Sequence, residues 1–148
     1  MVFYFTATGN SLYVAKQLDE ARVSIAQAVH DGEKVYTAEK IGIVCPVFGH
    51  EVPPLVREFL TQSNFRTDYF YMILTYGNRH GGAADLVKEL LEELGIHPSY
   101  INIVRMADNF LPGFDMDEQK ALDKNVDGQI EQIVRDIGAG EEYIAPVT

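Results

Sequence analysis

The sequence predicts an α/β protein in which a parallel β-sheet carries helices on both faces. Apolar runs of strand length alternate with longer segments whose apolar residues recur every three or four positions, the order expected of β-α-β units. In addition, the run IGIVC at residues 41–45 is apolar throughout, which is typical of a central strand buried on both faces of a parallel sheet. Taken together, these patterns favour one layer of strands between two layers of helices.

The first third of the chain contains two predicted strands and one helix. A strand at residues 2–5 is followed by a polar turn and then by a helix over about 11–21, and a short apolar strand follows at 23–26. Residues 27–39 are polar and show no clear period. We therefore expect a loop or one irregular turn there in place of a full helix.

The middle of the chain continues the alternation. Pro46 ends the strand at 41–45, and Pro54 begins an amphipathic helix, because proline is favoured at the first position of a helix. Residues 69–74 form the fourth predicted strand.

The last part of the chain contains two helices separated by the fifth strand, at 100–104. The first helix spans about 83–94 and is ended by Gly95. We expect its leucines to face inward, namely Leu86, Leu90, Leu91 and Leu94. The final long helix is predicted by apolar residues at spacings of four, four, three and four: Leu122, Val126, Ile130, Ile133 and Ile137.

Composition narrows the class of protein. A chain of 148 residues with 47% hydrophobic residues fits one domain, residues 1–148, with its own core. We find no apolar run near the roughly 20 residues that span a bilayer and no signal peptide, so a cytoplasmic location is expected. The net charge of −10 argues against nucleic acid or an anionic membrane as a partner and suits docking on basic faces of other proteins.

The hexapeptide TATGNS at residues 6–11 is the most informative motif. It separates the first strand from the first helix, so backbone N–H groups and the positive end of the helix dipole point to one place. Three hydroxyls and one amide could add hydrogen bonds, and no Lys or Arg is present. This pattern predicts a phosphate site built from dipoles. The alternative is a polar turn that does no more than cap the helix.

Residues 2–11 resemble the opening strand and FMN-phosphate loop of flavodoxins, whose pattern is a hydroxyl residue, any residue, Thr, Gly, Asn, and then Thr or Ser. Later segments resemble the flavodoxin-like module of bacterial flavodoxin–ferredoxin fusion proteins: PVFG at 46–49, LTYG at 74–77, GG at 81–82 and DNFLP at 108–112. The resemblance implies a flavodoxin-like three-layer sandwich, with a five-stranded parallel sheet in the order 2-1-3-4-5 and the second helix missing. The cysteine-rich cluster segments of the fusion proteins have no counterpart, because Cys45 is the only cysteine.

The resemblance further implies FMN as the cofactor. The phosphate would be held by Thr6, Thr8, Gly9, Asn10 and Ser11. The flavin ring would lie between the loops after the third and fourth strands, where Phe48 and Tyr76 are the stacking candidates. The residues expected around the ring are Pro46, Phe48, Gly49, Thr75, Tyr76, Gly77, Asn78 and Gly82. The chain departs from the family at His50-Glu51 and at Arg79-His80.

Three functions are compatible with this reading. The first is an FMN-binding electron-transfer protein that shuttles electrons between redox partners, either a ferredoxin-type protein or a reductase. The second is an FMN-dependent oxidoreductase that uses NAD(P)H to reduce a quinone or another small acceptor. The third is a flavodoxin-like domain without a cofactor that serves as a binding module. No metal site is expected, because the four histidines lack metal-ligand spacing.

Overall fold

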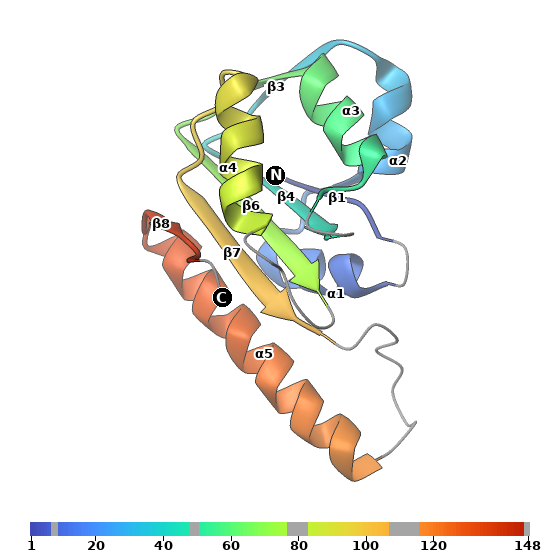
Figure 1. The fold of residues 1–148 in the computed structure, drawn as a ribbon, viewed down its shortest axis with the longest axis vertical. Helices are drawn as coiled ribbons and strands as arrows, with labels where there is room; N and C mark the ends of the chain where they lie inside the picture. Colours follow the sequence, from blue (N-terminus) through green and yellow to red (C-terminus); the bar gives the residue numbers. More distant parts are fainter. Residues whose placement is uncertain (7–8, 48–50, 77–82, 107–115, 147–148) are drawn as a thin grey trace.

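The computed structural model describes the chain with the exception of residues 7–8, 48–50, 77–82, 107–115 and 147–148 (Figure 1). Within the last helix, the side chains of residues 116–125 are also outside the description. Predicted site residues that fall in these gaps are named below, and their roles stay predictions.

The main sheet has six parallel strands in the order β2-β1-β4-β6-β7-β8. The strands are β1 (Val2–Tyr4), β2 (Arg22–Ser24), β4 (Lys40–Pro46), β6 (Tyr69–Tyr76), β7 (Tyr100–Arg105) and β8 (Tyr143–Ile144). The first five in this spatial order are the predicted strands in the predicted order, so the fold class is confirmed. The sequence analysis missed β8, which adds a two-residue edge beside β7.

Helices cover both faces of this sheet (Figure 1). One face carries α1 (Asn10–Leu18) and α5 (Met116–Gly138), and the other carries α2 (Ile25–Ala28), α3 (Pro54–Gln62) and α4 (Ala83–Glu93). Side chains of the central strands alternate between the two cores. In β6, for example, Phe70, Met72 and Leu74 pack with α3 and α4, whereas Tyr69, Tyr71 and Ile73 pack with α5. The result is the predicted three-layer arrangement.

The segment after β2 differs from the prediction in detail. The strand predicted at 23–26 ends at Ser24, and Ile25 begins the one-turn helix α2, which is followed by the 3₁₀ turn η1 (Val29–Asp31). Ile25 is fully buried, and a short apolar run does not distinguish a buried strand from a buried helical turn. The second helix is therefore reduced to a single turn, close to the expected irregular turn.

A second, two-stranded parallel sheet was missed by the sequence analysis. It pairs β3 (Lys34–Thr37) with β5 (Ser63–Arg66). Its inner face is aromatic: the rings of Tyr36 and Phe65 stack with their centroids 5.9 Å apart, and both lie near the buried ring of Phe59. In β3 only Tyr36 is buried, and in β5 only Ser63 and Phe65 are partly buried, so neither strand produces a continuous apolar run.

The prediction that all four leucines of the helix expected at 83–94 face inward was wrong for Leu86. Its side chain is 45% exposed, while Leu91 is fully buried and Leu90 and Leu94 are partly buried. On the other face of the sheet, the described residues whose spacing predicted α5 are all buried: Val126, Ile130, Ile133 and Ile137.

Polar bonds fix the C-terminal end of α5 to the sheet. The Tyr100 hydroxyl donates to Asp136 Oδ2 at 2.7 Å, and the Tyr69 hydroxyl donates to the Glu141 carbonyl at 2.5 Å. Lys40 Nζ donates to the Ile137 carbonyl at 2.5 Å, where a cation suits the negative end of the helix dipole. Burial, with the nearby acids, raises the pKa of Tyr69 to about 12, so its phenol stays protonated and available as a donor.

Close packing between β4 and β6 depends on a glycine. A Cβ atom at Gly42 would lie 2.0 Å from ring carbons of Tyr71, which is 3% exposed and has no room to move. Gly42 is therefore required by the space that the Tyr71 ring occupies.

Replacing Gly42 with alanine is expected to lower the free energy of unfolding by about 1–3 kcal/mol, because the added methyl group overpacks the core. Urea denaturation measures this. Gly138→Ala is the matched control: no described atom lies within 4 Å of a Cβ there, and alanine in a helix should be neutral or stabilising. A Gly42→Ala protein as stable as the parent would contradict the packing argument.

Candidate functional site

The candidate site lies at the edge where β1, β4, β6 and β7 end. Hydrogen bonds hold these ends in register. The Phe5 N–H donates to the Val44 carbonyl at 2.9 Å, the Val47 N–H to the Thr75 carbonyl at 3.0 Å, and the Met106 N–H to the Tyr76 carbonyl at 2.8 Å. The ends of these strands therefore lie side by side.

This edge contains the point where the strand order reverses. From β1 the chain crosses through α1 to β2 on one side, and later returns to β4 on the other side of β1. The helix that follows β1, α1, lies on one face of the sheet, whereas α2 and α3 lie on the other. The chain segments that leave the ends of β1 and β4 therefore turn towards opposite faces. In open α/β sheets such a point forms the crevice in which ligands bind.

The turn between β1 and α1 has the geometry that an anion site needs. Gly9 is the N-cap residue of α1 and has a φ of 91°, in the left-handed region that favours glycine. Its N–H donates to Thr6 Oγ1 at 2.8 Å. The N-cap glycine supplies no side-chain cap to this nine-residue helix, and the first turn of the helix contains no acidic residue. The positive end of the helix dipole is therefore not neutralised by a carboxylate of α1.

These features fit a phosphate group. Helix N-terminal N–H groups attract anions, and the Thr6 hydroxyl, which accepts from Gly9, still has its own O–H to donate. Gly9 is exposed, and among the described residues no atom lies within 4 Å of the position that a Cβ would take. Asn10 is half-buried in the first turn. Thr8 lies outside the described residues.

Ser11 and Thr75 come from the two halves of the predicted site and meet in the core. Their hydroxyl oxygens are 3.2 Å apart, and the residues are 1% and 3% exposed. This hydrogen bond joins the first turn of α1 to the end of β6. Both hydroxyls are thus already engaged with each other, and their predicted contacts with phosphate and ring stay predictions.

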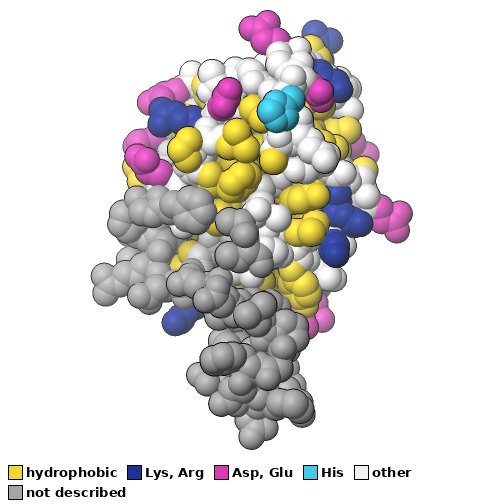
Figure 2. Space-filling model, turned by 90° about the vertical axis from the view of Figure 1, so that its right-hand side faces the viewer, with side chains coloured by type: hydrophobic (Ala, Val, Ile, Leu, Met, Phe, Trp, Pro, Cys, Tyr) yellow, Lys and Arg dark blue, Asp and Glu magenta, His cyan; other side chains and the backbone are white. Residues whose placement is uncertain are grey.

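Two further predicted residues flank the edge. Pro46 is the last residue of β4 and lies opposite Thr75, and Tyr76 is the last residue of β6 and lies opposite Arg105. Pro46 and Tyr76 are both half-buried. The remaining ring candidates lie outside the described residues: Phe48, Gly49, Gly77, Asn78 and Gly82. Figure 2 views the molecule from the side towards which these strands run, and apolar side chains lie across the middle of that face.

The sequence analysis did not assign Arg105. It ends β7, is exposed, and brings a guanidinium to the edge that carries Tyr76. The Gln129 side chain of α5 holds its backbone, accepting from the Arg105 N–H at 2.9 Å and donating to the Arg105 carbonyl at 3.2 Å. Its position directly after the predicted fifth strand was the available signal.

Other chemistries find no support in the described part of the chain. There, no group of three or more His, Cys, Asp or Glu side chains could hold a metal ion. Cys45 is fully buried, and burial raises the pKa of its thiol to about 12, so it stays an unreactive thiol. None of the described helices has both the length and the apolar character to cross a bilayer.

Comparison with known proteins gives a structural likeness. No protein-family model matches the chain, and no curated protein matches its sequence. Among solved structures, a candidate flavoprotein from Bacteroides uniformis matches with a TM-score of 0.60 and 15% identity, over 91% of this chain and 96% of that one. The two-electron reduced flavodoxin of Megasphaera elsdenii matches with a TM-score of 0.52 and 22% identity, over 85% and 98% of the two chains.

The chain has a flavodoxin-like fold. A third match, to rubredoxin:oxygen oxidoreductase of Desulfovibrio gigas, has a TM-score of 0.53 and 13% identity and covers 88% of this chain but 35% of that one. This flavodoxin-like arrangement therefore occurs both as a whole chain and as part of a longer one. At these identities the likeness extends to the fold alone.

The Ser11–Thr75 bond can be tested by a double-mutant cycle. Ser11→Ala or Thr75→Val alone leaves a buried hydroxyl without its partner, which should cost about 1–3 kcal/mol of unfolding free energy. Changing both should cost less than the sum of the two single changes, because neither hydroxyl is then left behind. Urea denaturation of the four proteins measures the coupling. Additive losses would show that the two hydroxyls do not interact.

Proposed function

We propose that this protein binds FMN at the edge formed by β1, β4 and β6 and transfers electrons between redox proteins. The observation that carries the proposal is the turn at Gly9, with its positive φ and its acid-free helix N-terminus, placed where the strand order reverses. The likeness to a flavodoxin and to a candidate flavoprotein supports the same conclusion.

Each part of the edge has a role in this proposal. The Thr6 hydroxyl and the first-turn N–H groups of α1 bind the phosphate, with Thr8, Asn10 and Ser11 as the further predicted contacts. Tyr76 and Phe48 form the walls for the ring, and Pro46, Gly49, Thr75, Gly77, Asn78 and Gly82 complete its surroundings. When bound, FMN supplies one- and two-electron transfer.

Charges around the edge tune this chemistry. The chain carries a net charge of −10, which disfavours added negative charge on the ring, whereas Arg105 at the end of β7 favours it. The acidic surface also selects partners with basic faces, which supports exchange with a ferredoxin-type protein or a reductase over binding to nucleic acid.

Titration with FMN and riboflavin tests the site. Riboflavin lacks the phosphate, so the parent protein should bind FMN more tightly than riboflavin. Thr6→Val should weaken FMN binding about tenfold, equal to about 1.4 kcal/mol for one lost hydrogen bond to a charged group, and should leave riboflavin affinity unchanged. Flavin fluorescence and visible absorption measure both.

Thr61→Val provides the matched control, because the Thr61 hydroxyl donates to the Arg57 carbonyl on α3, outside the candidate site. It should bind both flavins as the parent does. A parent protein that retains neither flavin would overturn the proposal and favour the binding module without a cofactor. Equal affinity for FMN and riboflavin would mean that the phosphate group of FMN is not bound at this turn.

A second measurement separates an electron carrier from an enzyme. A carrier should consume no NADPH or NADH with a quinone acceptor unless a separate reductase is added. Absorbance at the nicotinamide band follows this directly. Steady consumption by the purified protein alone would identify the FMN-dependent oxidoreductase instead.

A further inference from the structure

A groove separates α3 from α4 on the outer face of the molecule. It encloses a volume of about 400 Å³. One wall consists of Glu51, Val52 and the first turn of α3, and the other consists of the side of α4 that faces it. None of the residues that line it is assigned to FMN, so the groove is a feature separate from the candidate cofactor site.

The floor of the groove is apolar, and its rim contains an exposed leucine. Val87 is 2% exposed, Leu90 is partly buried and Leu86 is 45% exposed. Leu86 and Leu90 are four residues apart on α4 and therefore lie on the same side of the helix. Leu86 is the leucine that the sequence analysis expected to be buried, and a helix normally places such a side chain against a neighbour.

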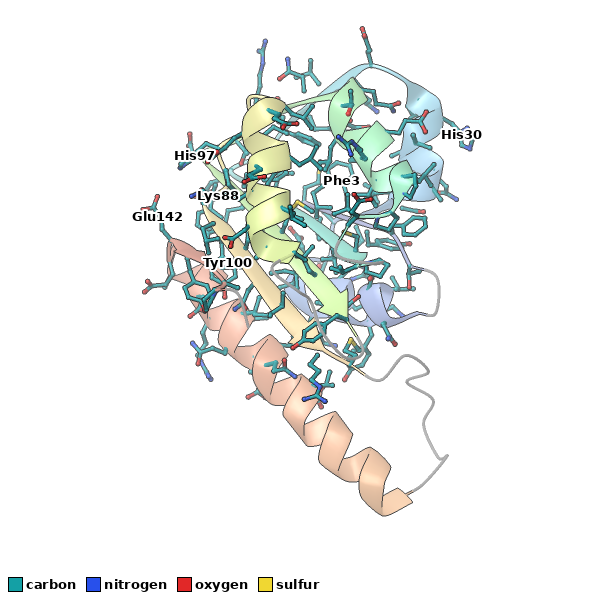
Figure 3. The ribbon with its side chains drawn as sticks, viewed as in Figure 1. Phe3, His30, Lys88, His97, Tyr100 and Glu142 are labelled. Atoms are coloured by element: carbon teal, nitrogen blue, oxygen red, sulfur yellow. The ribbon has the colours of Figure 1, made fainter. Side chains whose placement is uncertain are left out.

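The rim of the groove is acidic. Among the described residues that line it, the charged side chains are Glu51, Glu89 and Glu93 and one cation, Arg57. Lys88, the one lysine of α4, lies on the side of that helix away from α3 (Figure 3). Of the four carboxylates of α4, Glu89 and Glu93 thus line the groove, whereas Asp85, Glu92 and the ammonium group of Lys88 do not.

We propose that this groove binds a basic amphipathic helix of a partner protein. The partner's apolar residues would pack on Leu86, Val87 and Leu90, and its lysines or arginines would pair with Glu51, Glu89 and Glu93. From Leu86 to Glu93 the groove follows α4 for about 10 Å, which matches two turns of a bound helix. A second copy of the chain is disfavoured as the occupant, because each copy carries a charge of −10.

The test uses a short helical peptide with leucine on one face and lysine on the other, acetylated at its N-terminus and amidated at its C-terminus. Its binding to the full chain is measured by calorimetry, with and without excess FMN. A peptide with serine in place of leucine reports binding by charge alone. We expect the leucine–lysine peptide to bind more tightly than the serine peptide, equally well with and without FMN.

Two pairs of variants locate the binding. Leu86→Ser should weaken it about tenfold, whereas Val35→Ser should not, although Val35 on β3 is equally exposed at 49%. Two double variants remove the same number of negative charges: Glu89→Gln/Glu93→Gln and Glu141→Gln/Glu142→Gln. Only the first should weaken binding, because Glu142 follows α5 on the far side of α4 from α3 (Figure 3).

Each outcome bears on the proposal. If the two charge-matched variants lost the same affinity for the peptide, or if the serine peptide bound as tightly as the leucine–lysine peptide, binding would reflect a general attraction to an acidic protein. Either result would overturn the proposal. Self-association of the parent that Leu86→Ser abolishes would identify a second copy as the occupant and would also overturn it. Since the readout needs no flavin, failure here leaves the proposed FMN function untouched, and the reverse also holds.

Discussion

The buried bond between Ser11 and Thr75 is the contact on which the candidate site depends. It joins the first turn of α1, the helix that follows β1, to the end of β6, which lies two strands from β1 in the sheet. A hydroxyl pair in the core is stable only while both partners are present, because either one alone would be buried without a hydrogen bond. The first turn of α1 and the end of β6 are therefore held in a fixed relation, which is the preorganisation that the proposed cofactor site requires.

An anion site in a protein with a net charge of −10 needs local attraction that outweighs the overall field. At physiological ionic strength, salt screens charges that lie more than about 8 Å away, so the groups nearest the anion dominate the electrostatic potential that it meets. Here these are the N–H groups of α1, the Thr6 hydroxyl and a first turn without carboxylates. Residues 6–11 contain no lysine, so the proposed phosphate site depends on these dipoles for its local attraction. The acidic charge of the rest of the chain would then be available to select partners.

Elements whose residues form a continuous apolar run could be predicted from the sequence, whereas elements that depend on pairing with another strand could not. The central strands β4 and β6 were found because burial on both faces makes nearly every residue apolar. The strands β3, β5 and β8 are two to four residues long and exist because another strand lies beside them. For the site, the motif at residues 6–11 indicated the turn, but the pairing of Ser11 with Thr75 needs the three-dimensional fold. The exposure of Leu86 likewise depends on the distance between two helices, which periodicity does not encode.

The groove between α3 and α4 and the predicted ring site share their supporting elements. Residues 48–50 connect β4 to the start of α3, and residues 77–82 connect β6 to the start of α4. A helix held between α3 and α4 would thus rest on the two elements that follow the predicted ring loops. Affinity would then come from leucine packing and glutamate charge in the groove, while the redox potential would be set at the strand ends by the ring walls and Arg105. This separation would allow the choice of partner and the driving force for electron transfer to change independently.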